Sequence, residues 1–143
     1  MSIYTTFDQA ITYNESEIKT LFANAKGWEG KYRQIMLLGK QLPALADEYK
    51  QDTHLVKGCE SQVWLHFQIQ DEKNRGYQFA ADSDARIVKG LVIVILAAFN
   101  HKTAQQISDF DIEGYFAELD LLKHLSPSRS NGIHAIVQAI REI

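Results

Sequence analysis

The sequence holds a single cysteine, Cys59, among its 143 residues, and this scarcity excludes several kinds of protein. An internal disulfide needs two cysteines, so the fold cannot depend on oxidation, which fits a reducing cytoplasm. A dithiol redox couple needs a second cysteine in the same chain. A structural zinc site takes about four ligands, and an iron–sulfur cluster is ordinarily held by several thiolates. No phosphate-binding motif is present either, so we expect no metal and no bound cofactor.

Long apolar runs and an excess of basic charge are also lacking. The most apolar run, Leu91–Phe99, has nine residues, about half of the ~20 that a membrane-spanning helix requires. The opening MSIYTTFDQA has neither the basic region nor the apolar run of a signal peptide. The net charge of −3 does not indicate the basic surface that nucleic-acid binding requires. These absences predict a cytoplasmic protein whose partners are neither nucleic acid nor membrane.

What is present is the composition of an ordinary folded domain. The chain is 45% hydrophobic and 23% charged, which is sufficient to bury a core without disulfides or metals. No internal repeat, low-complexity tract or Pro/Gly/Ser-rich linker divides it. A chain of this length is usually one domain. We therefore expect a single domain over residues 1–143.

Helical signals occupy the first third of the chain and the part after residue 82. The predicted helices cover residues 14–27, 28–38, a short turn over 43–49, 83–100, a segment from 103, and the C-terminal segment from 126. The clearest starts are the capping-box patterns at Asn14 and Thr103 and the Ser126–Pro127 pair. Ser83 is the predicted N-cap of the long helix, and Gly39 the predicted C-cap of the second.

The middle of the chain changes to a period of two. Within residues 62–70, four apolar side chains alternate with polar ones: Val63, Leu65, Phe67 and Ile69. Trp64 is the one large apolar residue on the polar face, where it either covers a loop or packs under a helix. Alternation of this kind predicts a strand, DEKNRG (71–76) a turn, and YQFAA (77–81) its partner strand. The predicted fold class is α+β, a small antiparallel sheet packed against several helices.

The lone cysteine falls in the connection that leads into this strand. A free cysteine is usually a small buried hydrophobe without chemistry. Here Glu60 and Ser61 follow it directly, and such polar neighbours are unusual beside a buried core residue. Gly58 gives the adjacent backbone conformational freedom, and Lys57 is expected to favour the thiolate, the reactive form. A polar loop that carries the only thiol indicates a nucleophile held on a rigid scaffold.

A lone thiol restricts the chemistry that Cys59 can perform. A cysteine hydrolase needs a histidine beside the thiol, and although any of the five histidines could approach, no protease signature surrounds Cys59. One thiol alone can accept a sulfur atom, become a persulfide and hand the sulfur on, because thiol exchange needs only a thiolate, access and an acceptor. The alternatives are a thiol peroxidase or hydrolase, and an adaptor that acts by docking alone.

Two charged residues further along the chain are candidates for the same site. Asp84 ends an Asp-Ser-Asp turn, which either caps the long helix with favourable charge or shelters the Cys59 loop. Arg129 opens the last helix, where a cation gains nothing from the helix dipole, and this predicts a tertiary role. That role is either to stabilise a thiolate or persulfide anion or to pair with Asp84 or Glu60.

Four blocks of the sequence, taken together, are typical of one family. They are YRQIMLLGKQLP (32–43), GCESQVWL (58–65), ADSDARIVKGL (81–91) and HLSPSRSNGI (124–133). In this order they resemble the SufE/CsdE family of sulfur acceptors for cysteine desulfurases, and the resemblance runs from about Trp28 to the C-terminus. SufE-like members typically read Cys-Gln-Ser-Gln and CsdE-like members Cys-Glu-Asn-Arg. Cys59 and the three residues after it combine the two patterns.

The resemblance implies a SufE-like fold and a role in sulfur transfer. A pyridoxal-phosphate-dependent cysteine desulfurase would deliver sulfane sulfur to Cys59 as a persulfide and be stimulated in turn. The sulfur would then pass to a downstream acceptor, such as a scaffold protein for iron–sulfur cluster assembly, or into a related pathway. By its position in the motif, Cys59 is the expected catalytic residue of a transfer protein that is not a self-sufficient enzyme. The supporting candidates from the sequence are Gly58, Glu60, Asp84 and Arg129.

Overall fold

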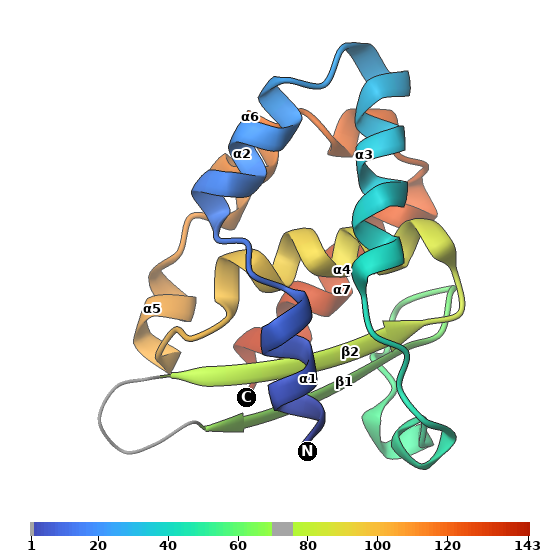
Figure 1. The fold of residues 1–143 in the computed structure, drawn as a ribbon, viewed down its shortest axis with the longest axis vertical. Helices are drawn as coiled ribbons and strands as arrows, with labels where there is room; N and C mark the ends of the chain where they lie inside the picture. The colour runs from blue at the N-terminus through green and yellow to red at the C-terminus, as the bar shows by residue number, and fades with distance from the viewer. Residues whose placement is uncertain (1, 70–75) are drawn as a thin grey trace.

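The computed structural model contains a two-stranded antiparallel sheet with helices on both of its faces (Figure 1). The structure describes residues 2–69 and 76–143. Its helices are α1 (Ile3–Ala10), α2 (Glu15–Ala23), α3 (Gly27–Gln41), α4 (Arg86–Phe99), α5 (Ala104–Asp109), α6 (Ile112–Leu119) and α7 (Pro127–Arg141). Its strands are β1 (Val63–Ile69) and β2 (Tyr77–Ser83), and short 3₁₀ turns cover Asp47–Tyr49, Asp52–His54 and Leu122–His124. The predicted α+β class is confirmed.

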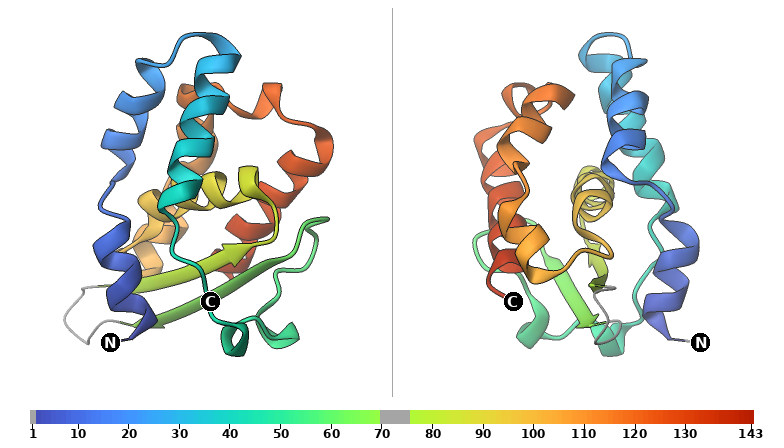
Figure 2. Two further views of the ribbon diagram at one scale, coloured as in Figure 1. Left: turned by 45° about the vertical axis from the view of Figure 1, so that its right-hand side comes forward. Right: turned by 90° about the vertical axis from the view of Figure 1, so that its left-hand side faces the viewer.

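The two strands pair in the way that the alternation predicts. Their register runs from Val63 opposite Ser83 to Ile69 opposite Tyr77. Residue 70 and the turn predicted over 71–76, apart from Gly76, lie outside the described residues. Helix α1 covers one face of the sheet, whereas α4 and α7 lie on the other (Figure 2). The sheet is therefore a central layer between helices.

The predicted strand is confirmed, but burial along β1 does not follow the alternation of apolar and polar residues. Phe67 and Ile69, on the face predicted to be apolar, are 45% and 62% exposed, whereas Trp64 on the polar face is 7% exposed. The segment before β1 folds back and places Lys50 Nζ 5.4 Å from the centroid of the Trp64 ring. Trp64 is therefore buried by packing, and sequence alternation alone does not show which face the neighbouring segments cover.

Asp82, at the end of β2, interacts with two other segments of the chain. The buried Asp82 carboxylate accepts a hydrogen bond of 3.0 Å from the backbone N–H of Leu45, and it lies 3.5 Å from Lys50 Nζ and 3.7 Å from Lys89 Nζ. A buried carboxylate is stable only when it is paired and hydrogen-bonded. The first aspartate of the Asp-Ser-Asp turn therefore fixes the segment after α3 and the start of α4 to the sheet, and it does not cap α4.

The predicted boundaries around α4 also need correction. Ser83 is the last residue of β2 and is not the N-cap; its Oγ accepts a 3.2 Å hydrogen bond from the N–H of Ala85, the residue at the N-cap position. After Pro43, the predicted turn of helix is confined to the 3₁₀ turn Asp47–Tyr49. The chain is held after Pro43 by the hydrogen bond of Leu45 to Asp82, and after Ser83 by the hydrogen bonds of Asp84 with Gln62, so no helix begins at either place.

Gly39, the predicted C-cap, instead lies inside α3, which continues to Gln41. The reason is the crossing of α3 over α4. A Cβ atom on Gly39 would lie 3.0 Å from the backbone N of Gly90, and a Cβ on Gly90 would lie 2.0 Å from the carbonyl oxygen of Ile35. Both glycines are therefore required because the two helix backbones touch, which is a tertiary constraint and not a helix stop.

Several helix starts are confirmed by their hydrogen bonds. The capping boxes of Asn14 with Glu17 and of Thr103 with Gln106 are both complete. Ser126 Oγ accepts the N–H of Arg129 at 3.3 Å, with Pro127 in the first turn of α7. The predicted apolar stripe of α7 is buried, namely Ile133, Ile136, Val137 and Ile140.

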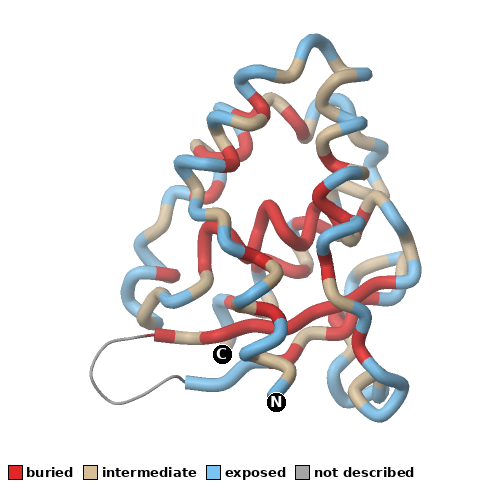
Figure 3. Tube along the Cα trace, viewed as in Figure 1, coloured by how far each residue is buried: buried red, intermediate tan, exposed pale blue. Residues whose placement is uncertain are grey.

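The core is centred on α4. Every residue of Leu91–Phe99 is buried, as expected for a core helix, and Figure 3 shows this helix as the buried centre of the molecule. Among the residues that the structure describes, no helix is long and apolar enough to span a membrane. The opening turns of α4 and α7 lie close to the loop that precedes β1, and there they form the candidate site.

Candidate functional site

The loop that carries Cys59 is closed at its base by hydrogen bonds to the backbone and to one side chain. Before the loop, the N–H of Val56 donates to the carbonyl of Val63 at 2.8 Å. After it, Gln62 N–H donates to Asp84 Oδ1 at 3.0 Å, and Asp84 N–H donates to the Gln62 carbonyl at 3.2 Å. The exposed Asp84 thus holds the end of the loop against the start of α4. Its side chain does not line the cavity beside the thiol.

The Cys59 thiol points toward α7 and is half-buried. Its Sγ donates a hydrogen bond of 3.4 Å to the carbonyl oxygen of Gly132. Burial raises the pKa of the Cys59 thiol above its usual range. The presence of Lys57 is expected to favour the thiolate and so to lower this pKa, but Lys57 is exposed to solvent and the net change is in the opposite direction. The thiol is therefore protonated at neutral pH while it stays in this position.

Gly58 adopts a backbone conformation that other residues rarely take. Its φ is +95°, and a Cβ added there would lie 3.3 Å from the Cβ of Ala135 in α7. The residue before the thiol thus lets the loop lie close against α7. The predicted conformational freedom of Gly58 is used here for a tight approach of the loop to the helix.

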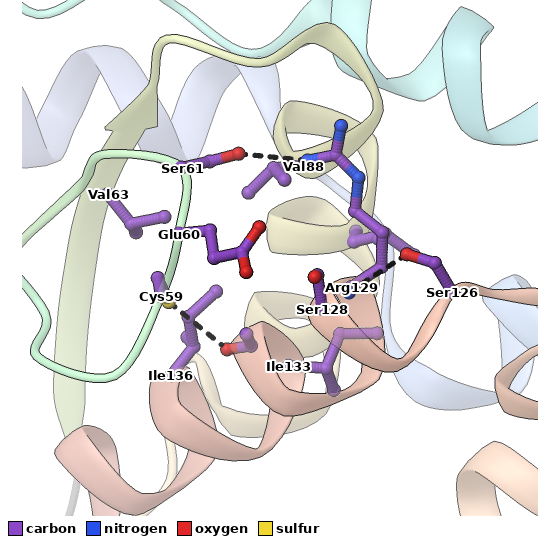
Figure 4. A pocket seen from close by; sticks show the side chains of 12 residues that line it. Cys59, Glu60, Ser61, Val63, Val88, Ser126, Ser128, Arg129, Ile133 and Ile136 are labelled. Atoms are coloured by element: carbon purple, nitrogen blue, oxygen red, sulfur yellow. Dashed lines mark hydrogen bonds between the residues drawn. The ribbon is translucent and has the colours of Figure 1, made fainter.

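A cavity of about 240 Å³ lies beside the thiol (Figure 4). Its apolar walls come from the start of β1, from α4 and from α7: Val63, Val88, Leu91, Ile133 and Ile136. Its polar residues come from the Cys59 loop and the start of α7: Glu60, Ser61, Ser126, Ser128 and Arg129. The space is larger than one sulfur atom needs and has both water-excluding walls and hydrogen-bonding groups.

Arg129 connects α7 to the Cys59 loop. Its Nη1 donates a hydrogen bond of 2.9 Å to Ser61 Oγ, across 68 positions of sequence. Among the described residues, the ion pairs do not include Arg129 with Asp84 or with Glu60. The carboxylate of Glu60 nevertheless points into the same cavity (Figure 4). The expected tertiary role of Arg129 is thus seen as a contact with the loop, through a serine that the sequence did not single out.

The structure brings four of the five predicted site residues to one place. Cys59, Glu60 and Arg129 line the cavity, Gly58 shapes the loop, and Asp84 lies outside at the loop base. Over residues 2–69 and 76–143, no group of three or more His, Cys, Asp or Glu side chains could hold a metal ion. The chemistry that these side chains offer is that of one thiol and one guanidinium lining the same cavity, which can hold an added atom.

The comparisons with known proteins agree with this architecture. A solution structure of a hypothetical protein from Thermus thermophilus matches with a TM-score of 0.64 at 14% identity, covering 95% of this chain and 90% of that one. At this level of identity the similarity concerns the fold alone. The model of the SufE family, described as an Fe–S metabolism associated domain, matches residues 16–143. The match includes Cys59 and every residue that lines its cavity, and the chain therefore belongs to the SufE family of Fe–S metabolism associated proteins, as its sequence resemblance predicts.

Proposed function

We propose that Cys59 accepts sulfane sulfur from a pyridoxal-phosphate-dependent cysteine desulfurase and carries it as a persulfide. The observation that supports this most is that the only thiol of a SufE-family chain lies beside a cavity of about 240 Å³. An ordinary core cysteine has no such space next to its sulfur. The desulfurase turns over faster when Cys59 removes its sulfur, and this is how the protein stimulates it.

The transfer is a thiol–persulfide exchange. The Cys59 thiolate attacks the outer sulfur of the persulfide on the donor cysteine. A bond forms between that sulfur and Cys59 Sγ, and the sulfur–sulfur bond of the donor breaks. The donor cysteine leaves as a thiolate and takes up the proton that Cys59 released. The sulfane sulfur keeps its oxidation state, so the step needs no external oxidant or reductant.

The surrounding side chains have separate tasks in this proposal. The guanidinium of Arg129 lines the cavity and offsets the negative charge that a persulfide carries on its terminal sulfur. The apolar side chains, Val88 and Ile136 among them, keep water and stray thiols away from that sulfur. Ser61 orients the guanidinium through its 2.9 Å hydrogen bond.

The resting position of the thiol implies a movement before transfer. In the cavity, Cys59 is protonated because burial raises its pKa, and its sulfur is half-buried. To reach a donor active site, the loop turns outward and exposes the thiol, which lowers its pKa toward the ordinary value. Gly58 is the residue whose backbone allows this turn. A few kcal/mol of contact with the donor is sufficient to shift such a two-state loop.

The sulfur then passes to a downstream acceptor such as a scaffold protein for cluster assembly. Residues 1–143 act in this scheme as one sulfur-acceptor domain, an accessory protein whose covalent intermediate depends on a separate enzyme. A thiol that forms no internal disulfide suits the reducing cytoplasm, where we place the protein.

Intact-mass analysis tests the proposal. After incubation with a cysteine desulfurase and free cysteine, the chain gains the mass of one sulfur atom, and a reductant removes it. A matched incubation without the desulfurase shows no gain. An unchanged mass beside an active desulfurase contradicts the proposal, and peroxidase or hydrolase turnover by Cys59 without any desulfurase would identify one of those alternatives instead.

A further inference from the structure

One stripe of α3 is partly exposed and carries aromatic and basic side chains. Trp28, Tyr32, Met36 and Lys40 follow one another at intervals of four, which places them on one face of the helix. Tyr32 is 43% exposed. Around them lie two hollows, one of about 610 Å³ with two aromatic rings and the opposite charges of Glu29 and Arg33, and a basic one of about 360 Å³; Met36 lines both. We call this continuous surface, with Arg86 at its basic end, the α3 stripe.

The basic end of the α3 stripe is formed where two helices cross. Gly39 and Gly90 let α3 and α4 approach backbone to backbone, and the basic hollow contains Lys40, Arg86 and Lys89. Lys89 is paired with Asp82 inside the fold. Lys40 and Arg86 are exposed, and neither takes part in the ion pairs of the described residues. Within the described part of the chain, two unpaired cations thus meet on one face, although the net charge is −3.

The positive charge of Arg86 does not stabilise the helix in which it lies. It is the first residue of α4, whose first turn contains no acidic residue. The positive end of a helix dipole disfavours a cation at this position. Arg86 thus does not stabilise its own helix and has no acidic partner among the described residues, so its charge is available to a negative group outside the chain.

The α3 stripe lies next to the Cys59 cavity. At one end, the Trp28 ring stacks on His124 with centroids 4.9 Å apart, and His124 precedes the cavity residue Ser126 by two positions. At the other end, Arg86 begins α4, and the first turn of this helix also carries the cavity residue Val88, whose side chain points to the opposite side of the helix. Figure 2 shows the start of α4 between α3 and the start of α7. The α3 stripe and the cavity thus share the start of α4 and the segment before α7, so a protein that covers the stripe contacts the elements that also form the cavity.

We propose that the α3 stripe is the docking surface for the cysteine desulfurase, through an acidic patch with an apolar centre. This rests on the proposed function, since it names where the sulfur donor binds. Aromatic residues, methionine and arginine are the types enriched in protein interfaces, and Tyr32, Met36 and Arg86 combine all three. The cations attract an acidic partner and orient it. A partner held here keeps its active site beside the cavity while the Cys59 loop turns toward it.

Affinity measurements with a desulfurase whose catalytic cysteine is replaced by serine test the docking surface without sulfur transfer. Arg86→Glu weakens binding about tenfold or more, because an attraction becomes a repulsion. This variant places an acid at the start of α4, which favours the helix, so lost binding cannot be ascribed to unfolding. Tyr32→Ala weakens binding several-fold. Added salt weakens the binding of the wild type more than that of Arg86→Glu.

Two matched variants control for general effects. Lys26→Glu reverses an exposed cation at the start of α3, and Leu37→Ala truncates a side chain that is 47% exposed. Leu37 is about 140° around the helix from Tyr32, and both controls line a different hollow. Both should bind the desulfurase as the wild type does.

The outcomes separate this proposal from the proposed function. If the wild type binds and accepts sulfur while Arg86→Glu and Tyr32→Ala bind equally well, the docking surface is wrong and the sulfur-acceptor function stands. If Arg86→Glu alters only the oligomeric state of the protein itself, the occupant is a second copy and the proposal is overturned. If the wild type neither binds nor accepts sulfur, the proposed function fails with it.

Discussion

The thiol of Cys59 and the carbonyl oxygen of Gly132 lie 3.4 Å apart, although 73 positions separate the two residues in the sequence. A carbonyl can only accept a hydrogen bond, so this contact favours the protonated thiol. Burial of the sulfur favours the same form and raises the thiol pKa. Both effects thus disfavour the thiolate, which is the form that oxidants attack.

The first prediction concerns the reactivity of this thiol. Iodoacetamide reacts with thiolates, so Cys59 in the folded protein should react slowly, with a rate that rises with pH around a midpoint above that of the denatured chain. The sign follows from the raised pKa, because less thiolate is present at any pH below it. Rates measured across pH for folded and denatured protein check this. Coinciding midpoints would show that the fold does not shelter the thiol.

A donor should change that rate. Addition of a desulfurase that lacks its own catalytic cysteine should accelerate alkylation of Cys59, because docking turns the loop outward. Serum albumin at the same concentration serves as the control and should have no effect. Equal rates with and without the desulfurase would mean that the loop is static.

The second prediction separates chemistry from docking. Cys59→Ser should abolish both the sulfur adduct and the stimulation of the desulfurase. The free energy of unfolding should change by less than about 1 kcal/mol, because serine is nearly isosteric and its hydroxyl can still donate to Gly132. Desulfurase assays and denaturant titrations measure the two quantities. Stimulation that survives in Cys59→Ser would identify the protein as an adaptor.

The third prediction assigns Arg129 to the transfer step. Arg129→Ala should slow sulfur acceptance about tenfold, the effect of ~1.4 kcal/mol on a barrier. Arg129→Lys should recover part of this rate, because the cation remains while the fixed geometry toward Ser61 is lost. Rapid-quench measurement of persulfide formation checks that the rate falls from the wild type to Arg129→Lys and again to Arg129→Ala. If acceptance is unchanged and only the melting temperature falls, Arg129 is a structural residue.

Helix starts could be predicted because their signals are local. The hydrogen bonds of a capping box join residues three positions apart. The N-cap roles of Asn14 and Thr103 can therefore be recognised from four consecutive residues. The same kind of signal was available for the two helices that sequence patterns missed, α1 after Ser2 and α6 after Asp111. Each has only eight residues, too few to show a repeated apolar face.

The parts that could not be predicted depend on contacts between distant segments. Gly39 resembles a helix stop until α4 is known to cross α3 at that point. Cys59 and Arg129 were identifiable from their unusual surroundings, a polar loop and a helix start. Their link through Ser61 spans 68 positions, and no local pattern encodes it. The residue types of the site were thus evident in the sequence, whereas their arrangement required the fold.

The last prediction uses Gly132 to separate stability from function. This glycine lies inside α7, where alanine is favoured by about 0.5–1 kcal/mol. A Cβ at this position would lie 3.6 Å from Cys59 Sγ, an ordinary contact that requires no rearrangement. Gly132→Ala should therefore raise the melting temperature. The added methyl group occupies space next to the thiol that the second sulfur of a persulfide needs, so sulfur acceptance should become slower.

Gly30→Ala is the matched control for this experiment. It also replaces a glycine within a helix, and its Cβ would meet only ordinary contacts, the nearest at 3.4 Å from Ala25. It should raise the melting temperature by a similar amount and leave persulfide formation unchanged. Thermal unfolding and intact-mass time courses on both variants measure the two effects. If Gly132→Ala accepts sulfur as fast as Gly30→Ala, the persulfide does not occupy this cavity, and its sheltered position must be sought elsewhere on the protein.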